Sequence, residues 1–274
     1  MRWLRLVRLG VHLFWGLLTI ACAYPLLQDR RRLQLKQRWS RQLLEMLGIR
    51  VDANLSRGAQ GHLIVANHIS WLDVFALNAT RPMAFVAKAE VRNWPVIGWM
   101  AAKTDTIFLQ RGRRSKALEI NADIAGLLAA GKDVAVFPEG TTTDGSTVLP
   151  FFGALMQPAI DIRHEVHPVS IAYFDEAGKP CLAPVYAGET TMIHSLAAII
   201  STPHITVHLS QTPAIAPNES TSRRILADMA RGAIAFSLGI SLSDRATLRH
   251  DPPGPSLPER VESPLYCGEM REQA

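Results

Sequence analysis

Cysteine is scarce in this sequence, with three cysteines in 274 residues. Cys22, Cys181 and Cys267 are far apart, and their spacing matches neither a zinc-binding motif nor a redox pair. An odd count would leave a free thiol in a secreted protein, so the cysteine usage favours a reducing compartment. The chain also lacks a G-x-S-x-G motif, which argues against a serine nucleophile elbow.

The sequence lacks a net positive charge beyond residue 42. Residues 1–42 contain nine Lys/Arg and one Asp, a net charge of +8, whereas the whole chain carries +5, so residues 43–274 carry −3. A nucleic-acid-binding domain would need a basic stripe with aromatic side chains nearby, and we therefore expect no nucleic-acid partner. An anionic membrane surface is the better partner, because each Lys or Arg beside a membrane gains about 1 kcal/mol there.

An uncharged apolar run of 19 residues, 9–27, lies within this basic segment. Crossing the hydrocarbon core of a bilayer takes about 20 helical residues, so the length is marginal for a span. Basic residues on both sides favour a helix within one leaflet as much as a spanning helix. A cleaved signal peptide is the alternative, because residues 21–23 (A-C-A) form an A-x-A site, but the arginines at 30–32 would resist translocation.

A second N-terminal segment, 33–49, has apolar residues at helical spacing on one face and basic residues on the other. It is expected either to pack on the domain that follows or to lie at the membrane interface. Residues 1–48 are therefore predicted to form a membrane-anchoring or interfacial segment, as one helix or as a helical hairpin.

Short β-rich runs alternate with helical runs beyond residue 48. The predicted strands are 62–67, 83–88, 104–110, 133–138, 166–174 and 205–210, and a helix is predicted over 115–130. This alternation predicts an α/β domain over 49–240, with a mainly parallel central sheet flanked by helices. Ligands of such sheets bind beyond the carboxyl ends of the strands. Residues 241–274 are rich in proline and are expected to be disordered.

His68 directly follows the predicted strand 62–67, and Asp73 comes five residues later. A histidine on the loop with a carboxylate on the following helix, beginning near Ser70, can act as a general base and its orienting partner. The alternative is structural: Ser70 and Asp73 have the spacing of a capping box, with His68 as a turn residue.

Three further segments place polar residues beside predicted strands. Phe108 and Arg111 lie at the end of the strand 104–110, where Arg111 is the first of three arginines within four positions, a pattern suited to phosphate or carboxylate. The segment 137–141 (F-P-E-G-T) follows the strand 133–138, and its glycine allows close backbone approach to a ligand. Pro168 stands near the start of the strand 166–174, which alone is unremarkable.

Metal binding is the natural rival interpretation for a chain with nine histidines. The nearest clusters are His164-Glu165-x-His167 and His204 with His208, and neither has supporting Cys or Asp at the spacing of a known metal motif. From the sequence we expect no metal ligands and interpret these residues as histidine faces of strands.

Together, and in this order, these segments resemble the glycerolipid acyltransferase family, whose best-known members are 1-acylglycerol-3-phosphate acyltransferases. His68 and Asp73 match the family's N-H-x4-D, Phe108 and Arg111 its G-x-x-F-x-x-R, residues 137–141 its F-P-E-G-T, and Pro168 its V-P-V element. The resemblance implies that His68 and Asp73 are catalytic, and that Phe108, Arg111, Glu139, Gly140, Thr141 and Pro168 bind substrate.

Two residues depart from the family pattern. Asp105 replaces the glycine three residues before Phe108, and Thr142 replaces the arginine that usually follows F-P-E-G-T. In the family that arginine is thought to help hold the acceptor's phosphate. A threonine there is similar to a branch that includes bacterial lyso-ornithine-lipid acyltransferases.

The resemblance implies a membrane-bound O-acyltransferase at the cytoplasmic face of a bacterial-type inner membrane. It would move a fatty acyl group from an acyl carrier protein or coenzyme A thioester to a lysolipid, converting 1-acylglycerol-3-phosphate to phosphatidic acid. The alternative acceptor is lyso-ornithine lipid or another lysolipid. No further cofactor is expected. Two other classes compete: a non-catalytic lipid-binding module at the membrane surface, and a lipid hydrolase that uses water as the acceptor.

Overall fold

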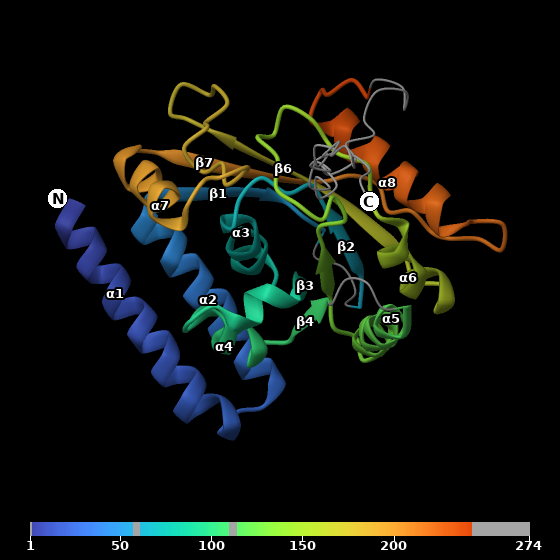
Figure 1. Ribbon diagram of the computed structural model, residues 1–274, viewed down its shortest axis with the longest axis horizontal. Helices are drawn as coiled ribbons and strands as arrows, with labels where there is room; N and C mark the ends of the chain where they lie inside the picture. The colour runs from blue at the N-terminus through green and yellow to red at the C-terminus, as the bar shows by residue number, and fades with distance from the viewer. Residues whose placement is uncertain (1, 57–60, 110–113, 243–274) are drawn as a thin grey trace, which may run out of the picture. The chain divides into compact units, whose positions relative to one another are not determined.

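A seven-stranded sheet lies at the centre of the computed structural model, which describes residues 2–56, 61–109 and 114–242. Its strands are β1 (Ile49–Asn54), β2 (Leu63–Ala66), β3 (Ala84–Lys88), β4 (Thr106–Leu109), β5 (Val134–Val136), β6 (Val166–Phe174) and β7 (Ile205–Gln211). They are arranged in the order β1-β7-β6-β2-β5-β3-β4 (Figure 1). All neighbours are parallel except β6 and β7. The predicted α/β fold with a mainly parallel sheet is confirmed.

Helices cover both faces of this sheet. The α-helices are α1 (Arg2–Leu18), α2 (Asp29–Leu47), α3 (Leu72–Thr80), α4 (Ile97–Ala102), α5 (Arg114–Ala129), α6 (Gln157–Asp161), α7 (Met192–Ser201) and α8 (Arg223–Ser237), with short turns η1 (Thr19–Ala23), η2 (Tyr24–Leu26), η3 (Ala89–Asn93) and η4 (Gly153–Met156). One hydrophobic core joins α2, α3 and α7 to the sheet, and a second core joins α5, α6 and α8 to it.

The strand β2 shows why helices pack on both faces of this sheet. Its side chains alternate between the cores, with Ile64 and Ala66 in the core under α3 and with Leu63 and Val65 in the core under α5. All four are buried. A short strand that is apolar at every position is therefore central and covered on both faces, as parallel strands usually are.

The strand β1 was not predicted, although its sequence carries a signal for it. Its residues, 49–54 (I-R-V-D-A-N), alternate between apolar and polar, and it pairs with β7 at the edge of the sheet. The prediction missed it because the strand follows directly on the amphipathic pattern of α2, whose apolar spacing continues to Ile49. The helix ends at Gly48, which adopts a left-handed conformation (φ 78°) that favours glycine.

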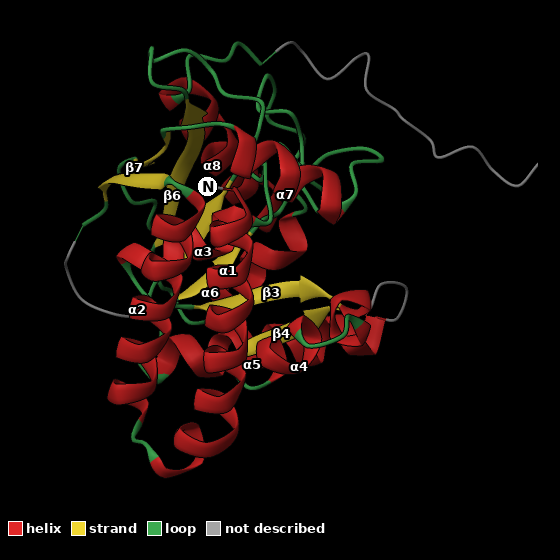
Figure 2. Cartoon of the chain, turned by 90° about the vertical axis from the view of Figure 1, so that its left-hand side faces the viewer, coloured by secondary structure: helices red, strands yellow, loops and turns green. Residues whose placement is uncertain are grey.

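The N-terminal segment forms a helical hairpin. Helices α1 and α2 lie side by side and antiparallel (Figures 1 and 2), and the ring of His12 stacks on Trp39 with centroids 4.7 Å apart. The run Trp3–Leu26 is 24 residues long and, by length and composition, apolar enough to cross a membrane. Trp3, Phe14 and Trp15 on it are well exposed. The predicted apolar N-terminal helix is therefore present.

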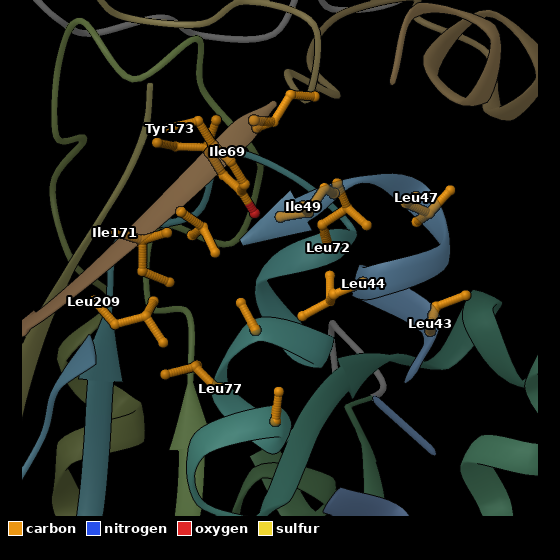
Figure 3. Packing of buried hydrophobic residues seen from close by; sticks show 14 of the residues in the cluster. Leu43, Leu44, Leu47, Ile49, Ile69, Leu72, Leu77, Ile171, Tyr173 and Leu209 are labelled. Carbon is orange, nitrogen blue, oxygen red and sulfur yellow. The ribbon is translucent and has the colours of Figure 1, made fainter. Parts of the chain in front are cut away.

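The second helix of this hairpin belongs to the core of the α/β unit. Leu43, Leu44 and Leu47 of α2 are buried, and they pack beside Leu72 of α3 (Figure 3). This contact fixes the position of α3, the helix that carries Asp73. The predicted tail lies outside the described residues from residue 243 onward.

Candidate active site

The ends of β2 and β5 bring two of the sequence motifs together. The two strands are parallel neighbours, with Val65 opposite Val136, so the segments that follow them leave the same edge of the sheet. The ring of His68 stacks on the ring of Phe137, with centroids 4.0 Å apart and planes 13° apart. The first residues after each strand therefore form one wall of the candidate site.

Asp73 orients the imidazole of His68. Its Oδ2 lies 2.8 Å from His68 Nδ1 and also accepts hydrogen bonds from the backbone N–H groups of Ile69 (2.8 Å) and Ser70 (3.0 Å). The bond to Ser70 also ties Asp73 to the start of α3, so one carboxylate both contacts His68 and holds the beginning of the helix. Helix α3 begins at Leu72, two residues later than predicted, and this leaves His68 on the loop as expected.

The side chain of Asp73 is fully buried, whereas about a fifth of the His68 side chain is exposed. A carboxylate that accepts the Nδ1 proton leaves the lone pair on Nε2, the second ring nitrogen. His68 can therefore act as a general base toward a substrate through Nε2, while Asp73 stabilises the charge that the ring acquires.

Tyr173 is a part of this site that the sequence did not reveal. It lies in β6 and donates a hydrogen bond of 2.7 Å from its hydroxyl to Asp73 Oδ1 (its position is shown in Figure 3). Burial raises the pKa of Tyr173 well above its ordinary value, and the Asp73 charge adds to this rise. The hydroxyl therefore remains protonated and donates at neutral pH. No motif marks it, because a tyrosine in a buried strand is an ordinary core residue in sequence.

Glu139 holds the two loops of the site together. Its Oε1 accepts the backbone N–H of His68 at 2.8 Å, and its Oε2 accepts the backbone N–H of Leu149 at 2.9 Å. Burial raises the pKa of Glu139, while the two backbone donors oppose the rise. The structure thus brings Glu139 to the backbone of His68, and both of its carboxylate oxygens bind backbone amides.

Gly140 and Thr141 belong to the turn that follows β5 and Phe137. Gly140 has φ 68°, a conformation that costs little only for glycine, and its N–H donates to Phe137 O at 3.1 Å. In the described part of the chain, no hydrogen-bond partner is found for the N–H of the exposed Thr141. The Thr141 amide is therefore available to donate to an oxyanion formed beside His68.

Thr142, which stands where the family has arginine, is tied to the protein backbone. Its Oγ1 donates a short hydrogen bond to the carbonyl oxygen of Tyr186, and the N–H of Tyr186 donates to Ile69 O at 3.0 Å. Thr143 adds a bond of 2.8 Å from its N–H to His68 O. These bonds fasten the turn to the His68 loop, and they leave a neutral side chain where the family places a cation.

Of the other predicted site residues, Phe108 lies apart from this centre. Phe108 is in β4, with β3 and β5 between it and β2, and the guanidinium of Arg92 lies 5.5 Å from its ring centroid. It lines a cavity of about 1090 Å³ between η3, β4 and α5, none of whose lining residues belongs to the His68 site. Pro168 is buried within β6 opposite Val65. Arg111 lies outside the described residues.

Comparisons with known proteins identify the family of the chain. A family profile described as Acyltransferase matches residues 48–172. The 1-acyl-sn-glycerol-3-phosphate acyltransferase of Neisseria meningitidis serogroup B is 36% identical over 182 residues, which cover 66% of this chain and 71% of that protein. The lyso-ornithine lipid O-acyltransferase of Pseudomonas aeruginosa is 35% identical over 207 residues, covering 76% and 79%.

A solved structure shares the fold. The crystal structure of the 1-acyl-sn-glycerophosphate acyltransferase from Thermotoga maritima superposes with a TM-score of 0.60 at 20% identity, covering 89% of this chain and all of that one.

Proposed function

The chain belongs to the acyltransferase family, in the group of 1-acylglycerol-3-phosphate and lyso-ornithine lipid acyltransferases, and we propose that it acylates the free hydroxyl of a lysolipid. The proposed donor is an acyl carrier protein or coenzyme A thioester, with no further cofactor, and the proposed acceptor is 1-acylglycerol-3-phosphate. The observation that carries the proposal is the His68–Asp73 pair, held at the carboxyl edge of the sheet with the second nitrogen of His68 available to a substrate.

The reaction follows from the positions of these groups. His68 Nε2 removes the proton of the acceptor hydroxyl as its oxygen attacks the thioester carbonyl carbon. The resulting oxyanion is stabilised by backbone donors at the turn, of which the Thr141 amide is the available one. When the carbonyl reforms, the carbon–sulfur bond breaks, and the imidazolium returns the proton to the leaving thiolate. Asp73 balances the charge of the imidazolium throughout.

A second acceptor, lyso-ornithine lipid, is favoured by one observation. The hydroxyl of Thr142 is bound to the carbonyl oxygen of Tyr186, so this position offers no positive charge to a phosphate. The relatives in both groups are about equally similar to the chain, at 36% and 35% identity.

We also propose that the protein acts at the cytoplasmic face of an inner membrane. The support is the apolar run Trp3–Leu26 with its exposed aromatic residues, together with the basic residues at both of its ends. Such a helix partitions into the interface or the hydrocarbon, and its arginines are attracted to anionic lipid.

The test is acyl transfer by the detergent-purified full chain. Radiolabelled palmitoyl groups on acyl carrier protein or on coenzyme A are offered to lysophosphatidic acid and to lyso-ornithine lipid in parallel. Formation of phosphatidic acid supports the main proposal, and formation of ornithine lipid alone supports the second acceptor. Release of free fatty acid with no acylated lipid would instead indicate a hydrolase and overturn both.

A further inference from the structure

Three potential metal ligands lie close together where the strands β2 and β6 begin, at the opposite ends of the strands from the candidate active site. His62 directly precedes β2, Glu165 directly precedes β6, and His167 is the second residue of β6. The two strands are parallel neighbours, with Ile64 opposite His167, so their starting residues converge. One ligand atom from each of the three side chains lies within 4.8 Å of the other two.

His167 has a buried nitrogen with an unmet bonding capacity. Only 7% of its side chain is exposed, and within the described residues its Nε2 has no hydrogen-bond partner. Glu165 Oε2 lies 3.5 Å from this nitrogen, which is beyond a good hydrogen bond. Buried polar atoms of proteins are nearly always satisfied, so this nitrogen, facing a carboxylate and close to a second imidazole, indicates a ligand.

We propose that His62, Glu165 and His167 bind one divalent transition-metal ion of the zinc type. Two imidazoles and one carboxylate are a donor set that Zn²⁺ accepts, and water would complete the coordination. Glu165 is about half exposed, so it can move the short distance needed to close the site around an ion. The bound ion would tie the starts of β2 and β6 together.

Arg81 lies beside the group, with its Nη2 3.2 Å from His62 Nδ1. Arg81 does not leave a net positive charge beside the ion, because it is paired with Asp133.

The groups behind the rings provide the outer contacts of the site. His62 Nδ1 lies 3.2 Å from Arg81 Nη2, which can only donate, and 3.7 Å from Asp133 Oδ1. Metal binding through the other ring nitrogen of His62 therefore requires Arg81 to move aside and Nδ1 to donate to Asp133. His167 Nδ1 lies 2.8 Å from Gln211 Nε2, while Gln211 Oε1 accepts the N–H of Ser56 at 3.0 Å. Metal binding therefore requires the half-buried Gln211 amide to turn its oxygen toward His167.

The sequence-based expectation was that no metal ligands are present. It rested on two clusters, His164-Glu165-x-His167 and His204 with His208, neither of which has supporting Cys or Asp at the spacing of a known metal motif. The third ligand, His62, is about one hundred residues away in sequence, and the parallel pairing of β2 with β6 brings it to the others. His164 itself binds Gly61 O through Nδ1 (2.8 Å) and is not part of the group.

The test is a metal titration of the tag-free full chain in detergent, after a chelator has removed bound metal. Binding of Zn²⁺ is measured by calorimetry, and binding of Co²⁺ by its visible absorption. We expect one ion per chain, Co²⁺ bands of four-coordinate intensity, and a rise in the melting temperature with Zn²⁺. Glu165→Gln and His62→Gln should weaken binding by roughly 10- to 100-fold. His208→Gln, at an exposed histidine outside the cluster, is the matched control and should bind as the wild type does.

The variant Gln211→Glu should bind the metal more tightly than the wild type does. A carboxylate accepts the Nδ1 proton of His167 without the rotation that the Gln211 amide needs, and we expect roughly tenfold tighter metal binding. Glu165 is on the surface, so its substitution tests the site without the folding risk that attends a buried histidine. Absence of binding by the wild type, or binding that Glu165→Gln and His62→Gln leave unchanged, would overturn the proposal. Neither readout depends on acyl transfer.

Discussion

The hydroxyl of Tyr173 donates to Oδ1 of Asp73 at 2.7 Å, while Oδ2 of the same carboxylate binds Nδ1 of His68. The two oxygens of Asp73 thus have different partners. Oδ1 is held by Tyr173 of β6, and Oδ2 orients the imidazole of His68. Tyr173 is fully buried and cannot reach a substrate, so its role is to position Asp73. The candidate active site therefore extends into the core, beyond the residues of the sequence motifs.

Tyr173→Phe removes this hydrogen bond and keeps the ring. We expect about 1.5–3 kcal/mol less stability, since the acceptor is a charged group. We also expect kcat about tenfold lower with KM little changed, because Asp73 then holds His68 less firmly. Tyr24→Phe is the matched control, as it also removes a buried hydroxyl bond, to Arg32 O (3.2 Å), but in the N-terminal hairpin. Equal kcat values in the two variants would contradict the positioning role.

Asp73→Asn keeps the size of the side chain and removes its charge. An amide no longer fixes the tautomer of His68 or balances the imidazolium, so we expect kcat to fall by up to about 10⁴-fold, and by no more than the loss of His68 itself causes. Asp52→Asn, at an exposed carboxylate of β1, should leave kcat unchanged. Circular dichroism of both variants verifies folding. A loss of less than tenfold for Asp73→Asn would favour a purely structural helix-capping role.

Glu139→Gln tests the buried carboxylate through the pH dependence of stability. Burial raises the pKa of Glu139 in the folded state above its unfolded value of 4.5, so its contribution to stability is present below that value and is lost as pH rises through the folded pKa. The free energy of unfolding of the wild type, relative to Glu139→Gln, should therefore fall as the pH rises above 4.5. Urea denaturation in detergent across this range measures it, and a constant or rising difference would show that the carboxylate is not destabilised by burial.

Thr142→Arg restores the cation that the family pattern has at this position. We expect kcat/KM for lysophosphatidic acid, relative to lyso-ornithine lipid, to rise about tenfold, because a charged hydrogen bond to phosphate contributes about 1.5–3 kcal/mol. Thr142→Ala also breaks the bond to Tyr186 O without adding charge, so it separates loss of the anchor from gain of the cation. If both variants change the acceptor ratio equally, charge at this position does not select the acceptor.

The sequence pattern was sufficient to predict those parts of the fold that are determined by neighbouring residues in the chain. Strand β2 is apolar at every position, and α5 was expected over 115–130 and extends over Arg114–Ala129, because buried strands and capped helices leave clear local signals. The edge strand β1 was missed where a helical pattern runs directly into it.

Some residues of the candidate sites could likewise be predicted from local motifs, and others could not. The family motifs placed His68 and Asp73 correctly side by side, but Tyr173 and the cluster around His62 depend on strand pairing across about one hundred residues. No local pattern reports such contacts. The placement of Phe108 three strands away from β2 likewise follows from strand order, which the sequence alone did not specify.

The most direct test of the account is acyl transfer by His68→Ala, measured with the purified full chain under saturating thioester donor and lysolipid acceptor. Removal of the general base should lower kcat by about 10²- to 10⁴-fold, with folding and membrane binding unchanged. Turnover within a few-fold of the wild type would contradict the central claim that His68, oriented by Asp73, activates the acceptor hydroxyl.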